Sequence, residues 1–199
     1  MPNMEVKCKR VGIVGEIFLK FNGFANKNVI RWLIDQGIEV IPPMLTPFFT
    51  QSFVNREINV ENKLDKSSMP KFVYDFLYKL VRKEISKFNK VLSRFRYPVE
   101  LEDIYELAKD VKKVLPLYTQ FGEGWLLPAE IVSYAKSGAD AVISLQPFGC
   151  IANHIISRGV ENRIKQLYPQ LNLLSLDFDG SVSDVNITNR LLMLKDSLK

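Results

Sequence analysis

The chain has 199 residues, of which 47% are hydrophobic, a formal net charge of +5 and two cysteines. This length suits one domain, or one domain with an insertion, and the composition is typical of a globular protein. No apolar run approaches the roughly 20 residues that span a bilayer, and the N-terminus lacks the apolar region of a signal peptide. Two cysteines are too few for a disulfide scaffold, so we expect a cytoplasmic protein that does not bind membranes.

Positive charge is concentrated in one segment of the chain. Residues 63–96 carry ten Lys or Arg against three Asp or Glu, a net charge of +7. Such a segment suits an anionic ligand or an acidic partner protein, and it is also typical of a solvated helix face. We expect no nucleic-acid partner.

The N-terminal part of the chain alternates strand and helix. Residues 11–15 are short and apolar and contain two glycines, as expected for a buried parallel strand, and residues 16–26 indicate a loop. Apolar residues at helical spacing predict a helix over residues 29–34 that ends at Gly37. A second strand over residues 38–41 completes a β-α-β unit whose two strands are parallel.

Residues 44–113 interrupt this alternation with three predicted helices, near residues 47–55, 70–95 and 101–114. The long middle helix carries a rough apolar stripe, which we interpret as core packing. The stripe consists of Phe72, Phe76, Leu80, Ile85, Phe88 and Leu92. We interpret the stretch as a helical insertion within a single α/β domain that spans residues 1–199.

Regular alternation then resumes to the end of the chain. The predicted elements are a helix from Pro128 to Lys136, a strand over 141–145, a helix over 151–168, a strand over 171–176 and a last helix opened by a Ser181–Asp184 capping box. Four parallel strands with helical crossovers predict a doubly wound, Rossmann-like α/β sheet, with the strand order 2-1-3-4.

In such sheets ligands bind beyond the carboxyl ends of the strands, where the winding reverses. Here that crevice is expected between the loop after the first strand (15–26) and the loop after the third strand (146–150). The loop over residues 122–125 leads into the Pro128 helix and is expected to line the same crevice.

Cys150 is the most informative residue, because it follows a strand and a Pro-Phe-Gly turn and precedes a helix. Unpaired amide groups at a helix N-terminus favour a thiolate, which binds metals or reacts. The alternative is a small buried hydrophobic side chain. Cys8 is expected at the opposite edge of the sheet, roughly 23 Å away, so the two cysteines neither pair nor share a metal.

His154, the only histidine, lies four residues after Cys150, about one helical turn on. This spacing permits a shared metal or a Cys–His pair. A surface or capping histidine is the alternative.

Two other motifs suggest different chemistry. The glycines at 12 and 15 follow the pattern of a dinucleotide loop only in part, because the G-x-G-x-x-G spacing is absent. Residues 177–181, Asp-Phe-Asp-Gly-Ser, resemble the nucleophile loop of haloacid-dehalogenase-type phosphatases. Fewer than twenty residues follow Ser181, which leaves no room for the downstream magnesium ligands, so Asp and Gly of an ordinary turn explain this motif.

Three blocks of the sequence, in this order, resemble the C-terminal part of the large proteins related to 2-hydroxyacyl-CoA dehydratases and their activators, often called CoA-substrate-specific enzyme activases. The blocks are Val11-Gly12-Ile13-Val14-Gly15-Glu16-Ile17 with Phe21-Asn22 and Phe24-Ala25-Asn26, then Gly122-Glu123-Gly124-Trp125-Leu126-Leu127, then Gln146-Pro147-Phe148-Gly149-Cys150 with Asn153-His154. The resemblance runs from about Lys9 to Leu194. It implies Rossmann-like α/β domains and a lyase reaction in which an ATP-driven activator passes one electron to a dehydratase that holds a four-iron, four-sulfur cluster on cysteines.

The resemblance also implies roles for individual residues. Cys150 would be a ligand of the cluster. The catalytic candidates are Glu16, Glu123, Asn153 and His154, and the cofactor-binding candidates are Gly15, Gly122, Gly124, Gln146 and Phe148. A cluster needs several thiolates, so the others would come from a further dehydratase or activator domain or chain, and the chain is expected to be part of a larger system.

Two functional hypotheses follow. In the first, the chain is a dehydratase-like domain that contributes Cys150 to an iron–sulfur site beside a CoA-thioester cleft. In the second, it is a non-catalytic binding or scaffold domain of the same fold, which uses its basic helical segment to dock a partner protein or the CoA phosphates.

Overall fold

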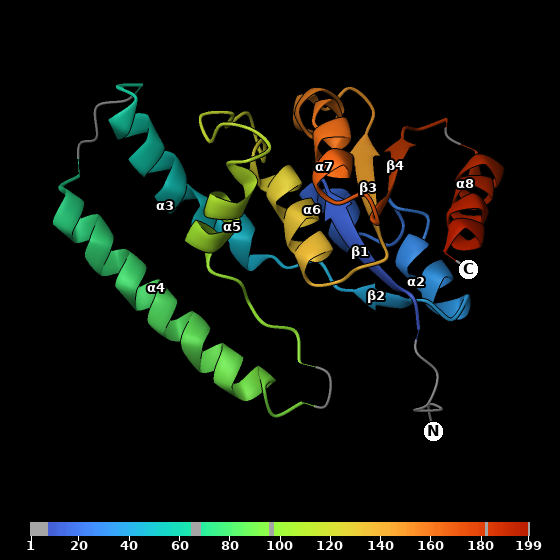
Figure 1. Ribbon diagram of the computed structural model, residues 1–199, viewed down its shortest axis with the longest axis horizontal. Coiled ribbons are helices and arrows are strands. Elements are labelled where there is room, and N and C mark those ends of the chain that lie inside the picture. Colours follow the sequence, from blue (N-terminus) through green and yellow to red (C-terminus); the bar gives the residue numbers. More distant parts are fainter. Residues whose placement is uncertain (1–7, 65–68, 96–97, 182, 199) are drawn as a thin grey trace.

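A computed structural model describes residues 8–64, 69–95, 98–181 and 183–198. Its centre is a sheet of four parallel strands in the order β2-β1-β3-β4 (Figure 1). The strands are β1 (Arg10–Gly15), β2 (Glu39–Ile41), β3 (Ala141–Pro147) and β4 (Asn172–Phe178). The predicted α/β class, parallel pairing and strand order are therefore confirmed.

Helices cover both faces of this sheet. On one face, α2 (Val29–Asp35) and α8 (Asp184–Ser197) pack their apolar residues against β1, β3 and β4. On the other face, α6 (Leu126–Lys136) and α7 (Glu161–Leu167) do the same. Strands buried from both sides are mostly apolar, which explains the run Ala141–Ile143 and Leu145 of β3, and its two buried polar residues, Ser144 and Gln146, hydrogen-bond to each other.

The segment between β2 and α6 forms a helical layer beside the sheet, visible at the left of Figure 1. It contains α3 (Thr46–Glu61), α4 (Lys71–Leu92) and α5 (Ile104–Val111). A separate apolar cluster joins α3 and α5 to α6 and is centred on the fully buried Trp125. The insertion is thus attached to the α/β core mainly where its helix α5 packs against α6 of the core.

The interpretation of the α4 stripe as core packing is wrong. No residue of α4 is buried, and Phe72, Phe76 and Phe88 are 73%, 59% and 61% exposed. The helix contacts its neighbours through Tyr74 and Tyr78, whose rings lie 5.2 Å from that of Phe53 on α3. The periodicity correctly predicted an amphipathic helix but could not show that no layer covers its apolar side.

Several element boundaries also differ from expectation. The predicted loop after β1 contains a short helix, α1 (Ile17–Phe21), and α6 begins at Leu126 rather than at Pro128. The predicted helix over residues 151–168 is two segments, the π-helical η1 (Ala152–Ser157) and α7. The last helix is capped at Ser183, so the predicted capping box at Ser181 does not form.

Within the described parts of the chain, no helix combines the length and the apolar character that a bilayer crossing requires.

Candidate functional site

The loops that follow β1 and β3 meet at the carboxyl edge of the sheet, as predicted. Glu16, directly after β1, donates its backbone N–H to the carbonyl of Leu145 on β3 at 3.1 Å. Gly15 precedes it with a φ of +131°, and a Cβ atom at this position would overlap the Leu145 carbonyl oxygen. A glycine is therefore required where the first loop leaves the sheet, which brings Glu16 next to the β3 loop.

Glu16 is held in place by the helix that it begins. Its Oε2 accepts a hydrogen bond from the backbone N–H of Leu19 at 3.0 Å, so the carboxylate caps α1. The predicted loop at this point is helical because this cap satisfies an amide that would otherwise lack a partner.

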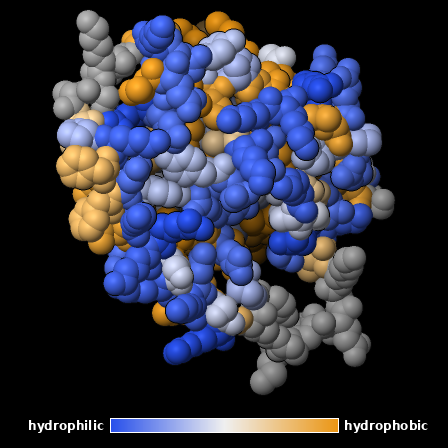
Figure 2. Space-filling view, turned by 60° about the vertical axis from the view of Figure 1, so that its left-hand side comes forward, coloured by the Kyte–Doolittle hydropathy of each residue, from blue (hydrophilic) through white to orange (hydrophobic). Residues whose placement is uncertain are grey.

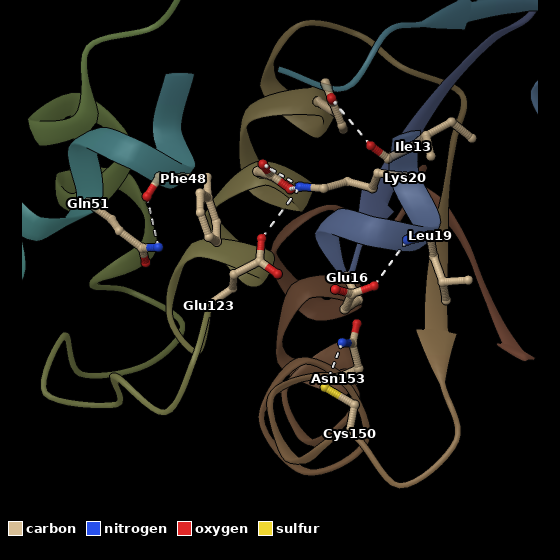
Figure 3. Close-up of polar contacts among 11 residues, drawn as sticks. Ile13, Glu16, Leu19, Lys20, Phe48, Gln51, Glu123, Cys150 and Asn153 are labelled. Carbon is tan, nitrogen blue, oxygen red and sulfur yellow. Dashed lines mark hydrogen bonds and ion pairs between the residues drawn. The ribbon is translucent and has the colours of Figure 1, made fainter. Parts of the chain in front are cut away.

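A buried charge cluster lies beside Glu16. The Lys20 side chain, only 2% exposed, donates from Nζ to both carboxylate oxygens of Glu130 at 3.2 Å. Its Nζ also lies 3.7 Å from Oε1 of Glu123 (Figure 3). One ammonium group from α1 is thus shared by two buried carboxyl groups, one from α6 and one from the loop before it.

Burial changes the ionisation of both carboxylates. Loss of solvation raises the pKa of Glu130 to about 7, against the opposing attraction of Lys20. The same cause raises the pKa of Glu123, and the nearby negative charge of Glu16 contributes to that rise. A carboxyl group with a pKa near neutrality, as burial gives Glu130, can exchange protons as a general acid or base.

Lys20 and Glu130 were not predicted as site residues. Each is a charged side chain in an otherwise apolar stretch, Ile-Phe-Leu-Lys-Phe and Leu-Leu-Pro-Ala-Glu-Ile-Val. Buried Lys and Glu are rare unless paired, so opposite charges in two apolar helices are a signal that could have identified them.

Cys150 lies on the other side of Glu16 (Figure 3). It follows the turn at Gly149, which has a φ of +80°, and its half-buried side chain lies directly before the helical turns of η1. The sulfur accepts a hydrogen bond from Nδ2 of Asn153 at 3.1 Å. Asn153 is fully buried, so this donor is fixed in place.

The Asn153 amide links Cys150 to Glu16. Its carbonyl oxygen is turned toward the Glu16 carboxylate and has no hydrogen-bond partner among the described residues (Figure 3). Both the Asn153 carbonyl oxygen and the Glu16 carboxylate accept hydrogen bonds, so neither can donate one to the other. A ligand or water that carries an O–H or N–H group would satisfy both oxygens.

His154 does not face Cys150. Its Nε2 lies 2.9 Å from Oδ1 of Asp177 at the end of β4, and Arg158 reaches the other oxygen of that carboxylate at 3.4 Å. The Cys–His pair that the spacing permits is therefore not formed. The His154 backbone N–H donates to the Cys150 carbonyl at 2.8 Å, so the one-turn relation of an α-helix is kept at this point, and the imidazole pairs with Asp177 instead.

The remaining site candidates surround this region in different ways. Gly122, with a φ of +60°, packs near Ala152 of η1, and Gly124 lies against the Thr119 carbonyl. Gln146 is fully buried and donates to the Ser144 hydroxyl at 3.2 Å. Phe148 is instead 75% exposed, its ring 6.0 Å from that of His154. The first three shape or fill the carboxyl edge, whereas Phe148 points outward.

Cys150 is a free thiol, and Cys8 is exposed. In the part of the chain that the structure describes, no three or more His, Cys, Asp or Glu side chains are grouped to hold a metal ion. Cys150 can supply one thiolate ligand to an iron–sulfur cluster. A complete cluster takes several thiolates, which the residues around Cys150 do not supply.

Comparison of the chain with protein-family models, with curated proteins and with solved structures finds no significant match.

Proposed function

We propose that this chain is a cytoplasmic α/β domain of a system similar to 2-hydroxyacyl-CoA dehydratases and their activators. In this proposal Cys150 is one thiolate ligand of an iron–sulfur cluster, and a further domain or chain supplies the others. The observation that carries the proposal is the setting of Cys150 at the carboxyl edge of the sheet, half-exposed and fixed by the buried Asn153 amide.

The surroundings of the sulfur support this assignment. An N–H group donated to sulfur stabilises the negative charge of a metal-bound thiolate. The turn before Cys150 and the start of η1 leave the sulfur partly accessible, as a shared ligand requires. The three sequence blocks, the last of which contains this cysteine, carry the resemblance to the same family.

The charge cluster around Lys20 gives the proposed site its proton-handling groups. Glu123 and Glu130 have raised pKa values, and Lys20 holds both within one cluster beside Glu16. We assign this cluster the role of exchanging protons with a substrate bound beside Cys150, with a CoA thioester as the expected substrate class.

The test is anaerobic reconstitution with iron and sulfide, with glutathione present to supply the remaining thiolates. The wild-type chain and Cys8→Ser should both retain a brown chromophore and bound iron after desalting. Cys150→Ser should retain neither, because Cys150 is the only proposed ligand in this chain. A colourless wild-type chain, or equal iron in Cys150→Ser, would refute the assignment.

A further inference from the structure

One side of α4 is apolar and largely exposed, and it borders an open groove that Thr46 at the start of α3 and Leu101 also line. Four residues recur on one face at helical spacing, and each is at least 40% exposed: Leu77, Leu80, Phe88 and Val91. We call this set the α4 face. Figure 2, which turns this side of the molecule forward, shows hydrophobic side chains reaching the surface beside hydrophilic ones. A contiguous apolar surface on a helix without buried residues indicates an interaction site.

The surface beside the α4 face is concave. A groove of about 480 Å³ runs along the helix. Its apolar lining comes from Leu80, Val81, Ile85 and Phe88 of α4 and from Leu101 of the segment that follows. A concave, apolar groove accepts a protruding element such as a helix with large side chains, whereas a bilayer surface is flat.

The positive charge around the α4 face favours a partner that carries negative charge. Between Lys71 and Leu92 there are six Lys or Arg and two Asp or Glu, a net charge of +4. Lys79, Lys83 and Lys90 follow one another along the flank of the face, and none has an acidic partner among the described residues. Unpaired cations beside an apolar stripe complement carboxylates on the partner.

A second copy of this chain does not fit the same surface. Pairing α4 with α4 would bring two helices of net charge +4 together, and like charges across an interface oppose association. The acidic residue in the groove, Glu84, is already paired with Lys87 at 2.6 Å and does not offset that repulsion.

We propose that the α4 face docks a partner protein through an amphipathic helix whose apolar side fills the groove and whose flanks carry Asp and Glu. This gives the binding-domain hypothesis a definite chemistry. It is independent of Cys150, because it involves a different surface and holds whether or not the chain binds a cluster.

The experiment measures binding of the folded chain to a synthetic amphipathic helix, by fluorescence anisotropy. The probe has a Leu stripe at helical spacing and Glu on both flanks, and a matched probe has Lys in place of Glu. We expect the Glu probe to bind about tenfold or more tightly than the Lys probe, and to weaken with added salt.

Variants locate the binding site. Phe88→Ser and the double variant Lys83→Glu with Lys90→Glu should each weaken binding of the Glu probe by about tenfold. Phe24→Ser, at a 92% exposed residue in the loop before α2, is the matched control and should bind as the wild type does. Circular dichroism checks that each variant is folded, which is expected because the substituted side chains are exposed.

Three results would overturn the proposal. The first is no binding of the Glu probe, or equal binding of both probes. The second is binding to phosphatidylserine-containing vesicles that Phe88→Ser abolishes while the Glu probe does not bind, which would assign the face to a lipid surface. The third is a dimer of the wild-type chain that Phe88→Ser dissociates, which would assign it to a second copy.

Discussion

Lys20 determines the electrostatics of the carboxyl edge through one buried ammonium group. Burial of an ion is unfavourable unless an opposite charge and hydrogen bonds compensate it, and Lys20 has both in Glu130 and Glu123. Removing one member of such a group leaves the others uncompensated. The cluster is therefore sensitive to both mutation and pH.

The sign of the pH dependence follows from Glu130. Its pKa is 4.5 before burial and about 7 in the folded chain, so the folded state binds this proton more tightly than the unfolded state. Its contribution to the free energy of unfolding is present below about pH 4.5 and is lost as the pH rises through about 7.

The substitution Lys20→Met should increase the loss of stability that accompanies a rise in pH. Two buried carboxylates then have no counterion, so we expect the free energy of unfolding to fall by about 3 kcal/mol at pH 8 and by clearly less at pH 5, where both carry protons more readily. Urea denaturation at the two pH values measures the difference. Lys27→Met, which breaks the exposed pair with Asp184, is the control and should change stability by less than about 1 kcal/mol at either pH. A loss for Lys20→Met that does not vary with pH would contradict this account.

At the scale of elements, glycines fix where strands and helices can lie. Gly15 lies against the Leu145 carbonyl and has a positive φ, whereas Gly159 has no atom within 4 Å of an added Cβ. The two positions should therefore respond to the same substitution with opposite signs.

Gly15→Ala should destabilise the chain by about 3 kcal/mol or more, because its Cβ displaces β1 from β3. Gly159→Ala should stabilise it by about 0.5–1 kcal/mol, since the helix between η1 and α7 gains a residue of higher helix propensity. Urea denaturation of both variants is the measurement. Equal effects would mean that the contact between Gly15 and β3 is not tight.

Much of the fold could be predicted from the sequence, because unbroken apolar runs mark parallel strands and the long segment between the second and third strands allows the chain to cross over β1. The meeting of Glu16 with Cys150 follows from the same topology. The sequence marks Lys20 and Glu130 as unusual charges in apolar stretches, but it could not show which residues pair in three dimensions: Lys20 with Glu130, and His154 with Asp177. Local spacing permitted a Cys150–His154 pair, and it could not show that the imidazole pairs with Asp177 on β4.

At the scale of the whole molecule, stability is distributed unevenly. The sheet lies between two apolar layers, whereas α4 buries no side chain and contacts the rest mainly through aromatic rings and the hydrogen bonds of Asn89 to Leu101. Segments with few buried contacts open at lower free energy than the core.

Limited trypsin digestion of the native chain should therefore make its first cut within residues 8–198 between Lys63 and Arg94. The α/β core should remain protected for longer, because cleavage there requires more extensive unfolding. Mass spectrometry of the early products identifies the cut. A first cut in α7, after Arg163 or Lys165, would show that α4 is held more firmly than its contacts indicate, and protection of α4 by the Glu-flanked probe would agree with docking.

The number of residues in the π-helical segment η1 affects how the Cys150 sulfur is oriented relative to α7. An α-helix rotates by about 100° per residue, and a π-type turn accommodates one residue more than an α-turn. Deleting a single residue within Ala152–Ser157 would rewind the segment and swing Cys150 by about a quarter of a revolution relative to α7. The direction of the thiol relative to α7 thus depends on the number of residues in η1 as well as on the side chains around it.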